Sequence, residues 1–121
     1  MTIVERTTEQ SIQYWGAAQD ALGVETVWSI WECQSVDQNL LKKKSYRISY
    51  TFIDGDATFD EVMNDSRWVT VTADTNGGTV RDLWEAAESC FQQAKARGDH
   101  HPYIENFVMQ DDGSFELVMG S

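Results

Sequence analysis

Two adjacent histidines are the residues of this sequence best suited to chemistry near neutral pH. Asp99, His100 and His101 follow one another, and Glu105 stands four residues further on. An imidazole titrates close to neutrality, so a histidine beside a carboxylate can take up and release protons. The same side chains could begin a metal site, but neighbouring residues of an extended segment point to opposite faces. Because no His-x-x-x-His pair brings two imidazoles together, the sequence predicts no metal ligands.

The tetrapeptide His100-His101-Pro102-Tyr103, with the helix expected before it, resembles the signature of pterin-4a-carbinolamine dehydratases. The resemblance implies proton transfer by histidines near a sheet, on a small bicyclic substrate. It covers only these four residues and the preceding helix. The sequence departs from the family where a further histidine is expected, because residues 111–114 are Asp-Asp-Gly-Ser, and the family's closing helix has no counterpart before Ser121. The plainer interpretation is that both histidines serve a turn between a helix and a strand.

Nucleophiles and phosphate-binding loops are not indicated by the sequence. Neither Cys33 nor Cys90 belongs to a Cys-x-x-Cys motif or a zinc-type cluster, and no serine lies in a Gly-x-Ser-x-Gly elbow. Both cysteines fall in apolar patterns, so we expect buried free thiols, which suits a reducing cytoplasm. Gly77 and Gly78 before Thr79 lack the Gly-Lys-Ser/Thr of a P-loop and predict a plain turn. We therefore expect neither enzyme activity nor a cofactor.

The net charge of −11 arises from 20 acidic and 9 basic residues. It disfavours direct binding to nucleic acid or to an anionic membrane surface, because both need cations to neutralise phosphates. It favours solubility and a basic protein as partner. Residues 1–6 do not have the pattern of a signal peptide, and no stretch approaches the ~20 apolar residues of a membrane span, so we expect a cytoplasmic protein.

Apolar periodicity predicts the elements that would position these residues. Helices are expected at 8–22, 59–65 and 79–97, each beginning at a capping residue. Strands are expected from β-branched and aromatic alternation at 24–36, 45–53, 67–73, 103–110 and 114–120. Asp112 and Gly113, between the last two runs, predict a tight hairpin.

The predicted order is α-β-β-(short α)-β-α-β-β, in a single domain over residues 1–121. Short connections favour antiparallel pairing, so we expect an α+β fold with an antiparallel sheet of about five strands and two main helices packed on one face. Segments 24–36 and 45–53 would form a long hairpin, with the lysines at 42–44 on a solvated tip. Segment 24–36 is apolar on both faces, which predicts either cover on both sides or a homodimer interface.

Clustered carboxylates suggest a function more strongly than any single motif. One cluster comprises Asp54, Asp56, Asp60, Glu61 and Asp65, and a second recurs along the 79–97 helix. Together they could form a negative face that enters a basic nucleic-acid channel of another protein, beside an aromatic anchor. The predicted partner-binding residues are Asp60, Glu61, Asp65, Asp82, Glu85, Glu88 and Trp31. The alternative is that turns and helix exteriors are acidic in any acidic protein.

We therefore expect a small acidic inhibitor of a basic, nucleic-acid-processing partner. In type it is similar to immunity proteins and to phage anti-defence proteins, of the anti-CRISPR or anti-restriction kind, that mimic nucleic acid; no motif identifies such a family. A small-molecule-binding domain or small enzyme, with a pocket near His100 and His101, is the first alternative. A structural or assembly subunit is the second.

Overall fold

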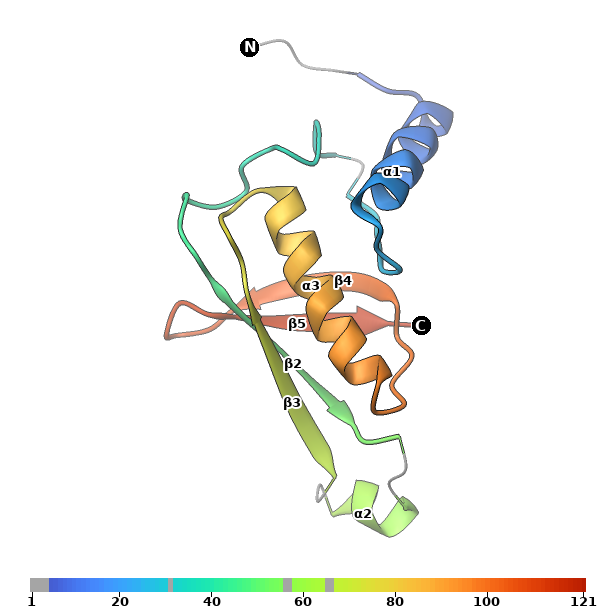
Figure 1. The fold of residues 1–121 in the computed structure, drawn as a ribbon, viewed down its shortest axis with the longest axis vertical. Coiled ribbons are helices and arrows are strands. Elements are labelled where there is room, and N and C mark those ends of the chain that lie inside the picture. The colour runs from blue at the N-terminus through green and yellow to red at the C-terminus, as the bar shows by residue number, and fades with distance from the viewer. Residues whose placement is uncertain (1–4, 31, 56–57, 65–66) are drawn as a thin grey trace.

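A computed structural model describes residues 5–30, 32–55, 58–64 and 67–121 of the chain. The helices are α1 (Thr8–Leu22), α2 (Phe59–Met63) and α3 (Val80–Lys95). The strands are β1 (Val27–Trp28), β2 (Arg47–Ile53), β3 (Trp68–Asp74), β4 (Tyr103–Met109) and β5 (Phe115–Gly120). The predicted element order and α+β class are confirmed (Figure 1). In the described part of the chain, no helix has the length and apolar character needed to cross a membrane.

The five strands form one mixed sheet in the order β1-β4-β5-β2-β3. The pairs β2–β3 and β4–β5 are antiparallel, whereas β1 runs parallel to β4 and β2 parallel to β5. The prediction of a purely antiparallel sheet was therefore wrong. The physical reason is that β2 and β5 are joined through β3, α3 and β4, and such a crossover lets neighbouring strands run in the same direction.

Helix α3 lies across one face of the sheet and supplies much of the core (Figure 1). Thr79 and Asp82 form the capping box at its start, and Ala96 is its C-cap, so the helix ends two residues before the predicted end at Arg97. Its predicted apolar stripe is buried throughout, at Val80, Leu83, Trp84, Ala87, Cys90, Phe91 and Ala94. Because a helix is stabilised chiefly by burying such a stripe, this contact fixes α3 on the sheet.

Helix α1 begins and ends where the sequence predicts. Thr7 and Gln10 form its capping box, and Gly23 ends it with a left-handed φ of 68°. Trp15 is 4% exposed, and its ring centroid lies 6.3 Å from that of Trp84 on α3. Helix α1 therefore packs beside α3 and reaches the core through this aromatic contact.

The prediction of a strand over 24–36 was wrong. Among the described residues of this segment, only Val27–Trp28 forms a strand, at the edge of the sheet beside β4. The predicted hairpin between 24–36 and 45–53 was wrong as well, because β4 and β5 lie between β1 and β2. The exposed lysines at 42–44 consequently lie in an irregular segment and not at a hairpin tip.

The chain after β1 wraps around the start of α3 instead of pairing with β2. The backbone N–H of Val80 donates to the carbonyl of Gln38 at 3.0 Å, and that of Arg81 donates to the carbonyl of Val36 at 2.7 Å. The apolar residues of this irregular segment enter the core at Ile30, Cys33 and Val36. The apolar residues on both faces of the predicted strand are thus explained by an irregular path through the core. The prediction of a homodimer was based on that strand and loses this support. The oligomeric state stays a prediction.

Candidate functional site: a cleft between two hairpins

A cleft opens where the β2–β3 hairpin and the β4–β5 hairpin separate. Strands β2 and β5 pair only at Ile48 with Phe115 and at Ser49 with Glu116. Beyond these pairs the two hairpins run in different directions (Figure 1). The cleft between them has a volume of about 670 Å³, within the ~300–1,000 Å³ usual for ligand sites.

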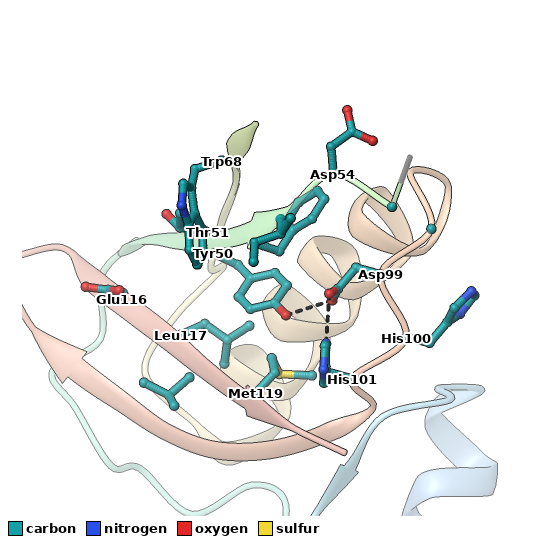
Figure 2. A pocket seen from close by; sticks show the side chains of 15 residues that line it. Tyr50, Thr51, Asp54, Trp68, Asp99, His100, His101, Glu116, Leu117 and Met119 are labelled. Atoms are coloured by element: carbon teal, nitrogen blue, oxygen red, sulfur yellow. Dashed lines mark hydrogen bonds and ion pairs between the residues drawn. The ribbon is translucent and has the colours of Figure 1, made fainter. Parts of the chain in front are cut away.

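The two diverging strands form the walls of the cleft, and two turns form its floor (Figure 2). One wall consists of residues 50–54 together with Trp68 of β3, and the other consists of residues 116–119. The floor consists of Gly55 and residues 98–101. The lining combines aromatic and aliphatic side chains with an almost equal number of polar and charged ones, so the cleft can contact both apolar and polar groups of a ligand.

The floor depends on a close approach of two backbone turns. The N–H of Gly55 donates to the carbonyl of Arg97 at 2.9 Å, and a Cβ on Gly55 would lie 2.7 Å from that oxygen. Gly98 has a φ of 91°, in the region that glycine adopts most readily. The N–H of Asp99 then donates to the carbonyl of Ala94 at 3.0 Å. These contacts hold Asp99 at the end of α3, facing the cleft.

Asp99 is the centre of a hydrogen-bonded group in the cleft (Figure 2). Its side chain is 5% exposed; one carboxylate oxygen accepts from the Tyr50 hydroxyl at 2.7 Å, and the other lies 2.7 Å from Nδ1 of His101. Burial first, and then the hydrogen bond to Asp99, raise the pKa of Tyr50 above its ordinary range. Tyr50 therefore keeps its proton and donates a hydrogen bond to Asp99, so the buried carboxylate has a partner on both oxygens.

His101 is the member of this group that can exchange protons with a bound molecule. Its side chain is 47% exposed, and no described residue hydrogen-bonds to its Nε2. Because Asp99 holds Nδ1, Nε2 is the nitrogen that can accept or donate a proton. The arrangement can therefore orient a polar ligand or transfer a proton.

His100 also lines the cleft, but its ring points away from that of His101 (Figure 2). The opposite directions agree with the prediction for adjacent residues in an extended segment. Among residues 5–30, 32–55, 58–64 and 67–121, no three His, Cys, Asp or Glu side chains are placed to hold a metal ion. Of the two histidines, His101 is therefore oriented by its hydrogen bond to Asp99, whereas the ring of His100 points away from it.

Asp54 forms a second charged centre, beside the floor. Its side chain is 9% exposed and pairs with Arg97 at 2.7 Å and with Arg67 at 3.1 Å. Arg67 also pairs with Glu61 on α2 at 2.9 Å, and this hydrogen bond is the main cause that lowers the pKa of Glu61. The network anchors α2 to the end of the β2–β3 hairpin, so Glu61 has a partner inside the fold.

The predicted partner-binding residues lie on two separate helices. Asp60 and Glu61 are on α2, at the end of the molecule opposite the start of α3 (Figure 1). Asp82, Glu85 and Glu88 are on α3. The remaining two, Asp65 and Trp31, lie outside the described residues. Contact with a partner stays a prediction for all seven.

The three predicted carboxylates on α3 have different environments. Glu88 accepts hydrogen bonds from the backbone N–H groups of Glu25 and Thr26 and from the Thr26 hydroxyl, at 2.9 to 3.1 Å. Asp82 caps its own helix. Glu85 is exposed, and with Asp82 and Asp74 it borders a hollow of about 220 Å³. Glu88 and Asp82 therefore support the fold, whereas Glu85 faces solvent.

Both cysteines are buried free thiols, as predicted. Burial raises the pKa of the Cys90 thiol to about 12. Burial, and then the charge of Glu32, raise the pKa of Cys33. A thiol that keeps its proton is a poor nucleophile, so neither cysteine is suited to covalent chemistry.

The sequence did not indicate Tyr50, Trp68 or Glu116 as site residues. Each belongs to a strand in which the alternation of apolar and polar residues already accounts for the residue type at that position. Its place in the cleft depends on how the two hairpins diverge. No protein-family model, curated protein or solved structure matches the chain. Its function must therefore be argued from the cleft and from the distribution of charge.

Proposed function

We propose that this protein is a small acidic inhibitor that binds and blocks a basic partner of the nucleic-acid-processing class. The observation that supports the proposal is how the fold uses its cations. Of the 9 lysines and arginines, those in ion pairs within the fold are Arg47, Arg67, Arg81, Lys95 and Arg97. The fold thus pairs five of its nine cations with its own carboxylates and leaves its excess carboxylates at the surface.

The excess carboxylates are spread over both helical and strand surfaces. Those that are exposed and have no ion pair with a described residue include Glu9, Asp20, Asp60, Glu85, Glu105 and Glu116. A surface field of one sign accelerates encounter with a surface of opposite sign and is screened by salt. A basic nucleic-acid channel complements such a field, so the protein would act there as a nucleic-acid mimic, in the manner of anti-CRISPR, anti-restriction or immunity proteins.

The experiment that tests the proposal uses exposed carboxylates that the fold does not need. Asp60 and Glu85 meet this condition, whereas Glu61, Asp82 and Glu88 have partners within the fold. The protein is used to capture partners from lysate at low and high salt, and each captured protein is tested for loss of nucleic-acid binding. We expect a basic partner that is held at low salt and released at high salt. We expect the double variant Asp60→Lys, Glu85→Lys to weaken this binding by about tenfold or more.

The matched control changes the net charge by the same amount on a different surface. Glu9 and Asp20 are both exposed on α1. The double variant Glu9→Lys, Asp20→Lys should weaken binding less than the Asp60, Glu85 variant if α2 and α3 contact the partner. A captured protein that still binds nucleic acid in the complex would count against the inhibitor proposal, and so would binding that is indifferent to salt.

A second candidate function is binding or proton transfer on a small molecule at His101. The specific observation in its favour is the Tyr50–Asp99–His101 group, which holds one imidazole nitrogen and leaves the other accessible. A small molecule bound there should raise the melting temperature of the native chain and lose that effect in His101→Gln. A ligand that stabilises both proteins equally would bind elsewhere.

A further inference from the structure

We propose that the cleft between the hairpins holds an extended segment of the basic partner, with an arginine or lysine side chain between Trp68 and Glu116. This inference rests on the proposed function and names the part of the protein that would receive the partner. It uses three properties of the cleft: unpaired strand edges, an unpaired carboxylate beside an indole, and negative charge at the floor.

The first property is that both walls are edges of strands. In β2, Asp54 and Tyr46 are hydrogen-bonded to the β3 side, so the alternation of backbone groups directs those of Thr51 and Ile53 toward the cleft. The register of β2 with β5 ends at Ser49 and Glu116, so among the described residues no strand pairs with this edge. Free N–H and C=O groups on a strand edge are satisfied by another extended backbone. This property selects an extended peptide as the occupant.

The second property is a pair of side chains, one from each wall of the cleft. Trp68 is 46% exposed and Glu116 is exposed; both line the cleft, and Figure 2 shows Trp68 close to Thr51 and Glu116 on the facing strand β5. No described residue forms an ion pair or hydrogen bond with the carboxylate of Glu116. An indole face and a carboxylate together attract a guanidinium or an ammonium group. This property selects a basic side chain on the peptide.

The third property is the charge of the remaining lining. Asp99 is buried at the floor, and the cations near it, Arg67 and Arg97, are both paired with Asp54. The cleft therefore offers an anionic ligand no free cation among the described residues, and the net charge of −11 opposes its approach. Nucleic acid is excluded as the occupant on this ground, and a basic peptide is favoured.

The test is an NMR titration of the ¹⁵N-labelled chain with blocked pentapeptides of the form acetyl-Thr-Arg-Thr-Arg-Thr-amide. We expect chemical-shift changes at the backbone amides of Thr51 and Ile53 and at the indole N–H of Trp68. The variant Trp68→Phe assigns this indole signal, because it removes it from the spectrum. The same peptide with glutamate for arginine should produce no changes. A peptide in which the central threonine is replaced by N-methylalanine should bind more weakly, because it loses a backbone donor.

Two variants distinguish binding of the peptide in the cleft from general attraction to the acidic surface. Glu116→Gln removes the carboxylate of the cleft, and Glu9→Gln removes an exposed carboxylate on α1, so the net charge changes equally. We expect Glu116→Gln to weaken the arginine peptide about fivefold, and Glu9→Gln to leave its affinity within about twofold.

The outcomes distinguish the two proposals. Shifts confined to the cleft and lost in Glu116→Gln support both. Shifts scattered over α1, α2 and α3, with equal effects of the two variants, overturn the cleft inference and leave the acidic inhibitor proposal standing. No binding of the arginine peptide at low salt overturns the cleft inference, and if the salt-dependent capture also fails, the proposed function is overturned with it.

Discussion

The junction between β2 and β5 is closed at one end and open at the other. At the closed end Ile48 is fully buried opposite Phe115, whose ring lies 5.7 Å from that of Tyr46, and α3 covers them with Cys90. At the open end α3 has finished, and the buried Tyr50, which stacks on Phe52, also donates a hydrogen bond to Asp99.

The difference shows how one pair of strands can serve both stability and binding. Apolar side chains beneath a helix bring the strands together, because burying them removes apolar area from water. Beyond the end of the helix a polar turn follows, and its carboxylate hydrogen-bonds to Tyr50 of β2. Changes of buried apolar side chains at the closed end should therefore have the largest effect on the free energy of unfolding, and changes of exposed side chains at the open end should affect mainly ligand binding.

The largest expected effect is that of Ile48→Ala at the closed end. The substitution leaves a cavity beneath α3, so we expect a loss of about 2–5 kcal/mol in the free energy of unfolding. Thr51→Ala, on the exposed side of the open end, deletes only the hydrogen bond of 2.8 Å to the Thr70 hydroxyl and should cost about 1 kcal/mol or less. Urea denaturation followed by far-UV circular dichroism measures both. Equal losses would mean that the two ends do not differ in packing.

Two tyrosines on the chain around β2 give the next comparison. Tyr50→Phe deletes the donor to the buried carboxylate of Asp99 and should cost about 1–3 kcal/mol. Tyr46→Phe deletes a hydrogen bond of 3.1 Å to the carbonyl of Lys42 and should cost about 0.5–1.5 kcal/mol. The same denaturation experiment ranks them. A larger loss for Tyr46→Phe would show that Asp99 does not depend on its tyrosine donor.

A pH dependence should also arise from the closed end. Burial raises the pKa of Cys90 from its ordinary 9.0 to about 12, so the unfolded chain loses this proton first as pH rises. The contribution of Cys90 is therefore complete below pH 9 and is lost between pH 9 and 12, at about 1.4 kcal/mol per pH unit. The difference in unfolding free energy between the native chain and Cys90→Ala, measured from pH 8 to 10.5, isolates this contribution. A difference that stays constant would contradict it.

Local signals in the sequence predicted the helices and the β4–β5 hairpin. The capping boxes at Thr7 and Thr79 and the apolar stripe of α3 each lie within a few turns of chain, so they can be recognised without the rest of the fold. The Asp112-Gly113 turn is equally local. The order of the strands depends on contacts between distant segments, and alternation does not specify which edges meet.

The site shows the same division between local and distant information. His101 and Asp99 attracted notice because they are neighbours, but the partner Tyr50 comes from a strand far away in the sequence. Glu88 was predicted to face a partner, yet it accepts hydrogen bonds from Thr26 before β1. An acidic residue on a helix looks the same in the sequence whether its carboxylate meets solvent or a loop.

The parallel junction of β2 and β5 also has a consequence for folding kinetics. Each hairpin can form from neighbouring residues, but their junction closes a loop that contains β3, α3 and β4. Closing that loop costs entropy before the contact is stabilised, so docking of the two hairpins should be the slow step. Until it occurs, the inner edges of both strands are exposed along their whole length, and this is the stage at which the chain is most prone to pair with a strand of another molecule.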